Sequence, residues 1–193
     1  MRSNDTGVVA MALVAWVAAC IVFGLISPDF GHLRHPVALL GAIGEPNALA
    51  FNLLGFVAPG LALAWLAWRW RGQRAADGWR ARIGLQLLLL SALAFVAQGL
   101  LPLDPTDLLA PASRAHAVTW SAWWLAFVAG GLLVGAGHAG RTGIALALLV
   151  LLLAMAGASL MPAALAQRLA FAGWFGWWLW AGRVSRASPS GRG

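Results

Sequence analysis

The stretch GVVAMALVAWVAACIVFGLI, residues 7–26, contains no charged side chain and decides the fold. Its twenty residues are the length that a helix needs to cross about 30 Å of hydrocarbon. A secretory signal is the alternative. The preceding segment, however, carries only Arg2 against Asp5, and the apolar run is longer than the core of a signal peptide. We therefore predict that residues 7–26 form a membrane span.

Five further apolar runs of similar length follow, at residues 48–68, 83–101, 117–136, 142–160 and 165–181. The chain of 193 residues is 61% hydrophobic and only 10% charged, a composition that suits lipid as the surrounding solvent. We therefore predict an all-α fold, a single bundle of six transmembrane helices over residues 1–183. The polar residues 184–193 are predicted to form a disordered cytoplasmic tail.

The arginines predict how these helices are oriented, because loops rich in positive charge stay on the cytoplasmic side. All thirteen basic residues are Arg; ten lie in the terminal segments and alternate connections, and three lie toward the other side: Arg34 and Arg114 in connections and Arg168 near the start of the sixth span. We therefore expect a multi-pass protein of the bacterial inner membrane, with both termini in the cytoplasm and segments 27–47, 102–116 and 161–164 outside. Because the net charge of +7 comes from these loops, the expected partners are membrane lipids and not nucleic acid.

Five polar residues fall near the outer ends of the predicted helices: Glu45, Asn52, Asp104, His116 and Arg168. Such side chains are costly near hydrocarbon unless they face a cavity, the bundle interior or the interface. One prediction is an outward-facing pocket that binds a small molecule or a lipid headgroup, in a sensor, an accessory subunit or a transporter component. The alternative is structural, with Asp104 paired with Arg168 or capping a short loop helix. Asn52 would then bond across helices, and His116 would lie in the headgroup layer.

Catalytic chemistry is a further alternative for the same region. His32 and His35, together with His116 and Asp104, offer three imidazoles and a carboxylate, a ligand set that suits Zn²⁺. The sequence does not place the two loop histidines near His116, so we assign no metal site and no cofactor. Asp104 and His116 would be the catalytic residues of a membrane-embedded lipid hydrolase or transferase, with or without a metal. No G-x-S-x-G motif and no phosphate-binding glycine loop accompanies them.

A third function class needs no site of its own. The chain would then be a structural partner of another membrane protein, or a homo-oligomer. Cys20 is the single cysteine and lies inside an apolar run, so no intramolecular disulfide forms.

Three local features refine the predicted helices. Asn47 precedes the second span and is a candidate N-cap, and Pro59 inside that span predicts a kink unless neighbouring groups compensate. The glycines of GGLLVGAGHAG, residues 130–140, either let the fourth span approach a neighbour closely or reflect only the composition of the chain.

Three runs together resemble a known family: HPVALLGAIGEPNALAFNLLGFVAPG (35–60), QGLLPLDPTD (98–107) and RLAFAGWFGWWLWAGR (168–183). The family is the bacterial and archaeal membrane family catalogued as domain of unknown function 998. Its recurring elements match Leu40, Gly41, Pro46, Phe51, Asn52, Pro102, Asp104 and His116. The chain departs from it at Ala38, where a small polar residue is expected, and in having no second histidine beside His116. The resemblance implies a six-helix fold and no particular activity.

Overall fold

The computed structural model describes residues 4–74 and 76–187, and within these ranges the chain is helical and contains no strand. In chain order the elements are α1 (Asn4–Ile26), the 3-10 helix η1 (Val37–Gly41), α2 (Ala48–Phe51), the π-helix η2 (Asn52–Val57), α3 (Ala58–Gln73), α4 (Trp79–Leu100), α5 (Pro111–Val134), the π-helix η3 (Gly135–Ala139), α6 (Gly140–Leu160) and α7 (Ala163–Ala187). The predicted all-α fold is therefore confirmed.

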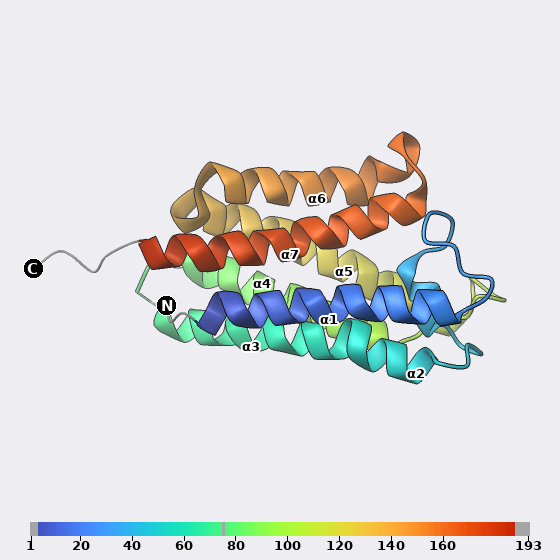
Figure 1. Ribbon diagram of the computed structural model, residues 1–193. Helices are drawn as coiled ribbons and strands as arrows, with labels where there is room; N and C mark the ends of the chain where they lie inside the picture. Colours follow the sequence, from blue (N-terminus) through green and yellow to red (C-terminus); the bar gives the residue numbers. More distant parts are fainter. Residues whose placement is uncertain (1–3, 75, 188–193) are drawn as a thin grey trace, which may run out of the picture.

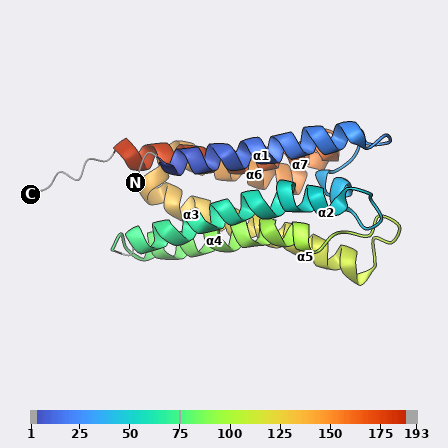
Figure 2. The same ribbon diagram turned by 60° about the horizontal axis from the view of Figure 1, so that its bottom comes forward.

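Five long helical segments are apolar enough to cross a membrane. They are Asn4–Ile26, Ala48–Gln73, Trp79–Leu100, Pro111–Gly137 and Gly140–Leu160, and each contains most or all of a predicted span. They lie side by side with α7 in a bundle (Figures 1 and 2). Large apolar side chains such as Met11, Leu25 and Met155 are more than 60% exposed on its outside. A surface of this kind is typical of a multi-pass membrane protein, whose helices face lipid.

Helix α7 contains the predicted sixth span, 165–181, but is less apolar than the other five segments. Gln167 and Arg168 lie in its second turn, and its later turns carry tryptophans that are completely buried in the bundle, Trp174, Trp177 and Trp178. The helix continues to Ala187, beyond the predicted start of the tail at residue 184. The rest of that tail, residues 188–193, lies outside the described residues.

The connections divide between the two ends of the bundle. One end holds the start of α1, the α3–α4 connection, the α5–α6 connection and the end of α7 (Figure 1). We call it the arginine-rich end, because Arg69, Arg71, Arg74, Arg80, Arg82, Arg141 and Arg183 lie in or beside its helix termini. The other end, here the loop end, holds the connections 27–47, 101–110 and 161–162 (Figure 1). Successive connections therefore lie at opposite ends of the bundle, as predicted.

The second long segment shows how the chain accommodates Pro59. Proline has no N–H to donate to the carbonyl of Gly55, and the preceding turn is the π-helix η2, in which the Ala58 N–H bonds to the Leu53 carbonyl five residues back. This π-turn therefore accommodates the hydrogen bond that Pro59 cannot donate. Asn47 does occupy the N-cap position of α2, but its side chain makes no capping bond, because its backbone (φ −108°, ψ 15°) lacks the extended conformation of a typical N-cap.

Glycine permits a close approach between α4 and α5. A Cβ atom added to Gly130 would lie 2.8 Å from the carbonyl oxygen of Gly84, and one added to Gly84 would lie 3.1 Å from the carbonyl oxygen of Gly130. Of the two alternatives that the sequence left open for the 130–140 glycines, close approach is the one found at Gly130, and it sets the distance between these two helices.

Candidate functional site

Asn52 binds the backbone of the first loop. Its side chain is 6% exposed, and its Nδ2 donates to the carbonyl oxygen of Gly41 over 2.9 Å. A Cβ atom on Gly41 would overlap the amide of Asn52, so only glycine fits opposite this side chain. The amide thus holds η1 against the start of the second long segment.

His116 binds the end of α4 from α5. The ring is 8% exposed, and its Nδ1 lies 2.9 Å from the carbonyl oxygen of Leu101, the residue that follows α4. Carbonyls at a helix C-terminus have no partner within the helix, and the imidazole satisfies one of them here. An N–H on Nδ1 would make this hydrogen bond, which leaves Nε2 without a proton in the neutral ring.

Asp104 organises its own loop. Its Oδ1 accepts hydrogen bonds from the side chain of Thr106 (2.7 Å) and from the backbone N–H of Thr106 (2.9 Å). The Thr106 bonds hold the pKa of the Asp104 carboxyl below its ordinary value, because they favour the charged form. Ser113 of α5 accepts a hydrogen bond from the Asp104 N–H at 3.0 Å and lies 2.9 Å from the Asp104 and Asp107 carbonyl oxygens. The sequence analysis missed Ser113 in this role; its place in the first turn after Pro111 was the available signal.

The start of α7 binds the 27–47 connection. Arg168 Nη1 donates to the carbonyl oxygens of His35 (3.0 Å) and Ala164 (2.8 Å), and its guanidinium lies 5.7 Å from the centre of the Phe30 ring. Gln167 accepts a hydrogen bond from the Val37 N–H at 2.8 Å. The alternative pairing of Asp104 with Arg168 is not formed, because each side chain is already engaged locally.

The remaining loop-end candidates make no common site with these residues. Glu45 is exposed, His32 is exposed beside Phe30, and His35 Nδ1 accepts from the Gly31 N–H at 3.0 Å. Within the described parts of the chain, no group of three or more His, Cys, Asp or Glu side chains could hold a metal ion. No hydrogen bond or ion pair joins any two of Glu45, Asn52, Asp104, His116 and Arg168. The loop-end polar groups mainly bind backbone atoms.

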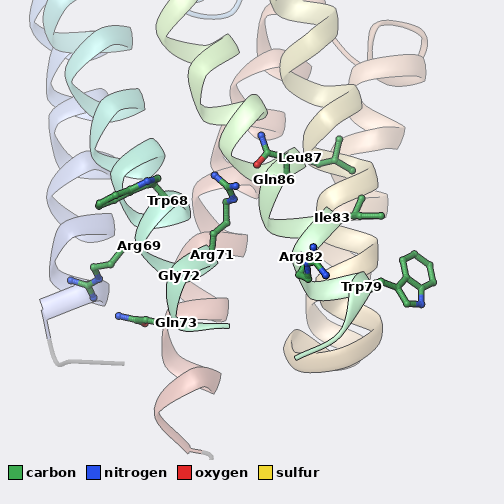
Figure 3. Close-up of a pocket in the computed structure, with 10 residues that line it drawn as sticks. All are labelled: Trp68, Arg69, Arg71, Gly72, Gln73, Trp79, Arg82, Ile83, Gln86 and Leu87. Carbon is green, nitrogen blue, oxygen red and sulfur yellow. The ribbon is translucent and has the colours of Figure 1, made fainter. Parts of the chain in front are cut away.

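A groove of about 970 Å³ lies at the opposite, arginine-rich end, between the last turns of α3 and the first turns of α4 (Figure 3). Its lining combines three arginines with two tryptophans, two glutamine amides and two aliphatic side chains. The lining residues are Trp68, Arg69, Arg71, Gly72, Gln73, Trp79, Arg82, Ile83, Gln86 and Leu87. We call this feature the arginine groove.

The three arginines of the groove are not equivalent. Arg69 points toward α1, whereas Arg71 extends from α3 toward Gln86 on α4 (Figure 3). Arg69 forms an ion pair with Asp5 of α1, whose carboxylate is fully buried. Trp70 Nε1 donates to the other oxygen of that carboxylate over 3.2 Å. The positive charge of Arg69 is thus already neutralised within the protein.

The side chains of Arg71 and Arg82 are exposed, and neither side chain makes a hydrogen bond or an ion pair with any described residue. The sequence analysis used both only to orient the chain. Their separation by one short connection was the signal that could have found them, because such a connection brings the end of one helix next to the start of the next. The groove is therefore a preformed cationic surface between two helices, edged by indole rings.

Comparisons with protein-family models, with curated proteins and with solved structures find no match to this chain, so the resemblance drawn from its sequence motifs stays a prediction.

Proposed function

We propose that this protein spans the bacterial inner membrane six times, with both termini in the cytoplasm, and binds the headgroup of an anionic lipid in the arginine groove. The observation that carries the proposal is the pair Arg71 and Arg82, exposed on facing helices of one groove and without a partner in the described chain. Planar guanidinium groups donate two parallel hydrogen bonds to phosphate, which makes arginine well suited to headgroup recognition.

The proposed orientation puts the groove at the cytoplasmic surface of the membrane. Eight arginines of the described chain lie at the arginine-rich end and three at the loop end, and positively charged loops stay in the cytoplasm. Helix α7 supplies the sixth span: its 25 residues extend about 37 Å, enough to cross the hydrocarbon. An even number of spans also agrees with both ends of the described chain lying at the same end of the bundle.

The surroundings of the groove suit a lipid better than a free anion. Trp68 and Trp79 are about 60% exposed beside the arginines, and indole rings favour the headgroup layer. Leu61 of α3 and Leu90 of α4 continue an exposed apolar surface from the groove toward the middle of the bundle. A headgroup on the arginines would therefore leave its acyl chains along these apolar faces, and basic pockets between helices on the cytoplasmic side bind headgroups in this way.

Lipid binding is tested by native mass spectrometry of the full chain, released from an uncharged detergent with phosphatidylglycerol or phosphatidylcholine. We expect phosphatidylglycerol to bind in preference to phosphatidylcholine, and the double variant R71Q/R82Q to lose that preference. The variant R141Q is the matched control, because Arg141 is exposed at the same end but does not line the groove. Equal loss in R141Q and R71Q/R82Q would show that only the overall charge matters and would overturn the groove assignment.

Orientation is tested by cysteine labelling in intact cells, in a C20A background. A76C places a thiol in the exposed α3–α4 connection, and L33C places one in the exposed 27–47 connection. We expect an impermeant maleimide added outside to label L33C and not A76C. The reverse pattern would invert the orientation.

The predicted outward-facing pocket and the lipid hydrolase or transferase alternative stay predictions. The bonds of Asn52, His116 and Arg168 to carbonyl oxygens favour a positioning role for these side chains instead. No loop-end group is therefore part of the proposed function.

A further inference from the structure

We infer that the lipid bound in the arginine groove carries two negative charges on its phosphate headgroup; the inference rests on the proposed function. It follows from how the charges at the arginine-rich end are compensated. The chain has six acidic residues, and four of them, Asp29, Glu45, Asp104 and Asp107, lie in the loop-end connections. Only Asp5 and Asp77 remain to compensate the arginines at the other end.

Both of these carboxylates lie next to arginines other than Arg71 and Arg82. Asp5 is paired with Arg69 and also accepts the indole N–H of Trp70. Asp77 lies near Arg74, which does not line the groove: burial lowers the pKa of Arg74, and the negative charge of Asp77 opposes that shift. Neither carboxylate therefore compensates Arg71 or Arg82.

Two positive charges are thus left on the groove walls, one from each helix. A monoanionic headgroup neutralises only one of them, whereas a headgroup with two negative charges neutralises both. The difference matters because charge at the edge of hydrocarbon is solvated less well than charge in bulk water, so an uncompensated guanidinium is more costly there.

The groove is also large enough and polar enough for such a headgroup. Its volume of about 970 Å³ is at the upper end of the range for pockets that hold small molecules. Gln73 and Gln86 add amide donors beside the arginines, and Ile83, which is 48% exposed, begins the apolar path for an acyl chain. The bound species is therefore a membrane lipid with a dianionic phosphate headgroup, not a soluble dianion.

The test compares lipids that differ in headgroup charge, again by native mass spectrometry of the full chain. Phosphatidic acid above about pH 8, where its phosphomonoester is largely dianionic, is compared with phosphatidylglycerol of the same two acyl chains. Cardiolipin, with two phosphodiesters, is the second dianion. We expect at least one dianion to bind about tenfold more tightly than phosphatidylglycerol. In R71Q and in R82Q this preference should fall to about threefold or less, while R141Q keeps it.

The outcomes separate the inference from the function on which it rests. If phosphatidylglycerol binds as tightly as both dianions, and R71Q weakens all three equally, the groove binds anionic lipid but the dianion inference is wrong. If no anionic lipid is preferred over phosphatidylcholine, both are wrong. If inorganic phosphate, which is largely a dianion above about pH 8, displaces cardiolipin at equal concentration, the groove recognises a soluble dianion, and the assignment to a lipid is overturned.

Discussion

The buried carboxylate of Asp5 forms an ion pair with Arg69, a residue 64 positions later in the chain that also lines the arginine groove. Asp5 lies in the first turn of α1, where the positive end of the helix dipole also favours a carboxylate. Arg69 keeps 22% of its side chain exposed and lies over the Trp65 ring at 4.7 Å. The pair therefore joins α1 to α3 at the edge of the proposed lipid site.

Removal of the Asp5 carboxylate should destabilise the bundle. D5A leaves Arg69 and the Trp70 indole without their acceptor, and because Arg69 is partly exposed we expect a loss of about 1–3 kcal/mol in the free energy of unfolding. Unfolding in mixed detergent micelles measures it. In a double-mutant cycle, D5N and R69Q should be less than additive. Strict additivity would mean that the two side chains do not stabilise each other.

The contact between Gly84 and Gly130 should tolerate no added side chain. In G130A the new Cβ would meet the Gly84 carbonyl oxygen, a backbone atom that moves only with its helix, so we expect a loss of about 1–3 kcal/mol. Gly176 of α7 is the control, because nothing lies within 4 Å of a Cβ added there. G176A should therefore be neutral or stabilising by up to about 1 kcal/mol. Equal unfolding free energies for G130A and the unmodified chain would contradict the close packing of α4 on α5.

The substitution N52A should partly rescue the loss of stability caused by G41A. G41A places a methyl group where the Asn52 amide lies, so it should lower the melting temperature and speed amide hydrogen exchange in η1. N52A removes the amide and loses its bond to the Gly41 carbonyl, but it also makes space. We therefore expect G41A to cost clearly less in the N52A background than alone. An identical cost in both backgrounds would place the clash elsewhere.

Arg168 should hold the 27–47 connection on α7. R168Q removes the charge-assisted bond to the His35 carbonyl, and such bonds contribute about 1.5–3 kcal/mol. Amide exchange around residues 30–38 should therefore become about tenfold faster or more, as measured by mass spectrometry. R34Q removes an exposed arginine from the same connection and should leave that exchange unchanged.

The Asp104 carboxylate should stabilise the folded protein at neutral pH and lose this effect as the pH falls. Its folded-state pKa is lowered, first by the Thr106 side chain and then by backbone N–H groups. Its contribution is thus present above the unfolded pKa of about 3.9 and is lost as pH falls through the folded value. D104A should therefore have a lower melting temperature than the unmodified protein at about pH 6, and the difference should shrink toward about pH 3. D29A, at an exposed carboxylate of the other long connection, is the control.

The extent to which the fold could be predicted differs from element to element. The helices at Ala48–Gln73 and Gly140–Leu160 begin at or within two residues of the predicted spans, because the apolar runs themselves mark them. The π-turn before Pro59 could not be predicted, since it depends on how the chain redistributes one missing hydrogen bond.

The candidate site was harder to predict than the fold. Asn52 and His116 were recognised as unusual polar residues, but their partners are carbonyl groups of Gly41 and Leu101, and carbonyl groups carry no sequence signal.

The sequence by itself determined the all-helical class, the positions of the long helices and the segregation of arginine into alternate connections. It could do so because a chain in hydrocarbon must satisfy its backbone hydrogen bonds locally, and a long apolar run leaves only the helix. Tertiary structure alone decided that Asp5 meets Arg69, that Gly84 meets Gly130, and that Arg71 and Arg82 face one groove. These contacts depend on the rotation of each helix about its axis. Helices that are apolar on nearly every face carry no stripe from which that rotation can be read.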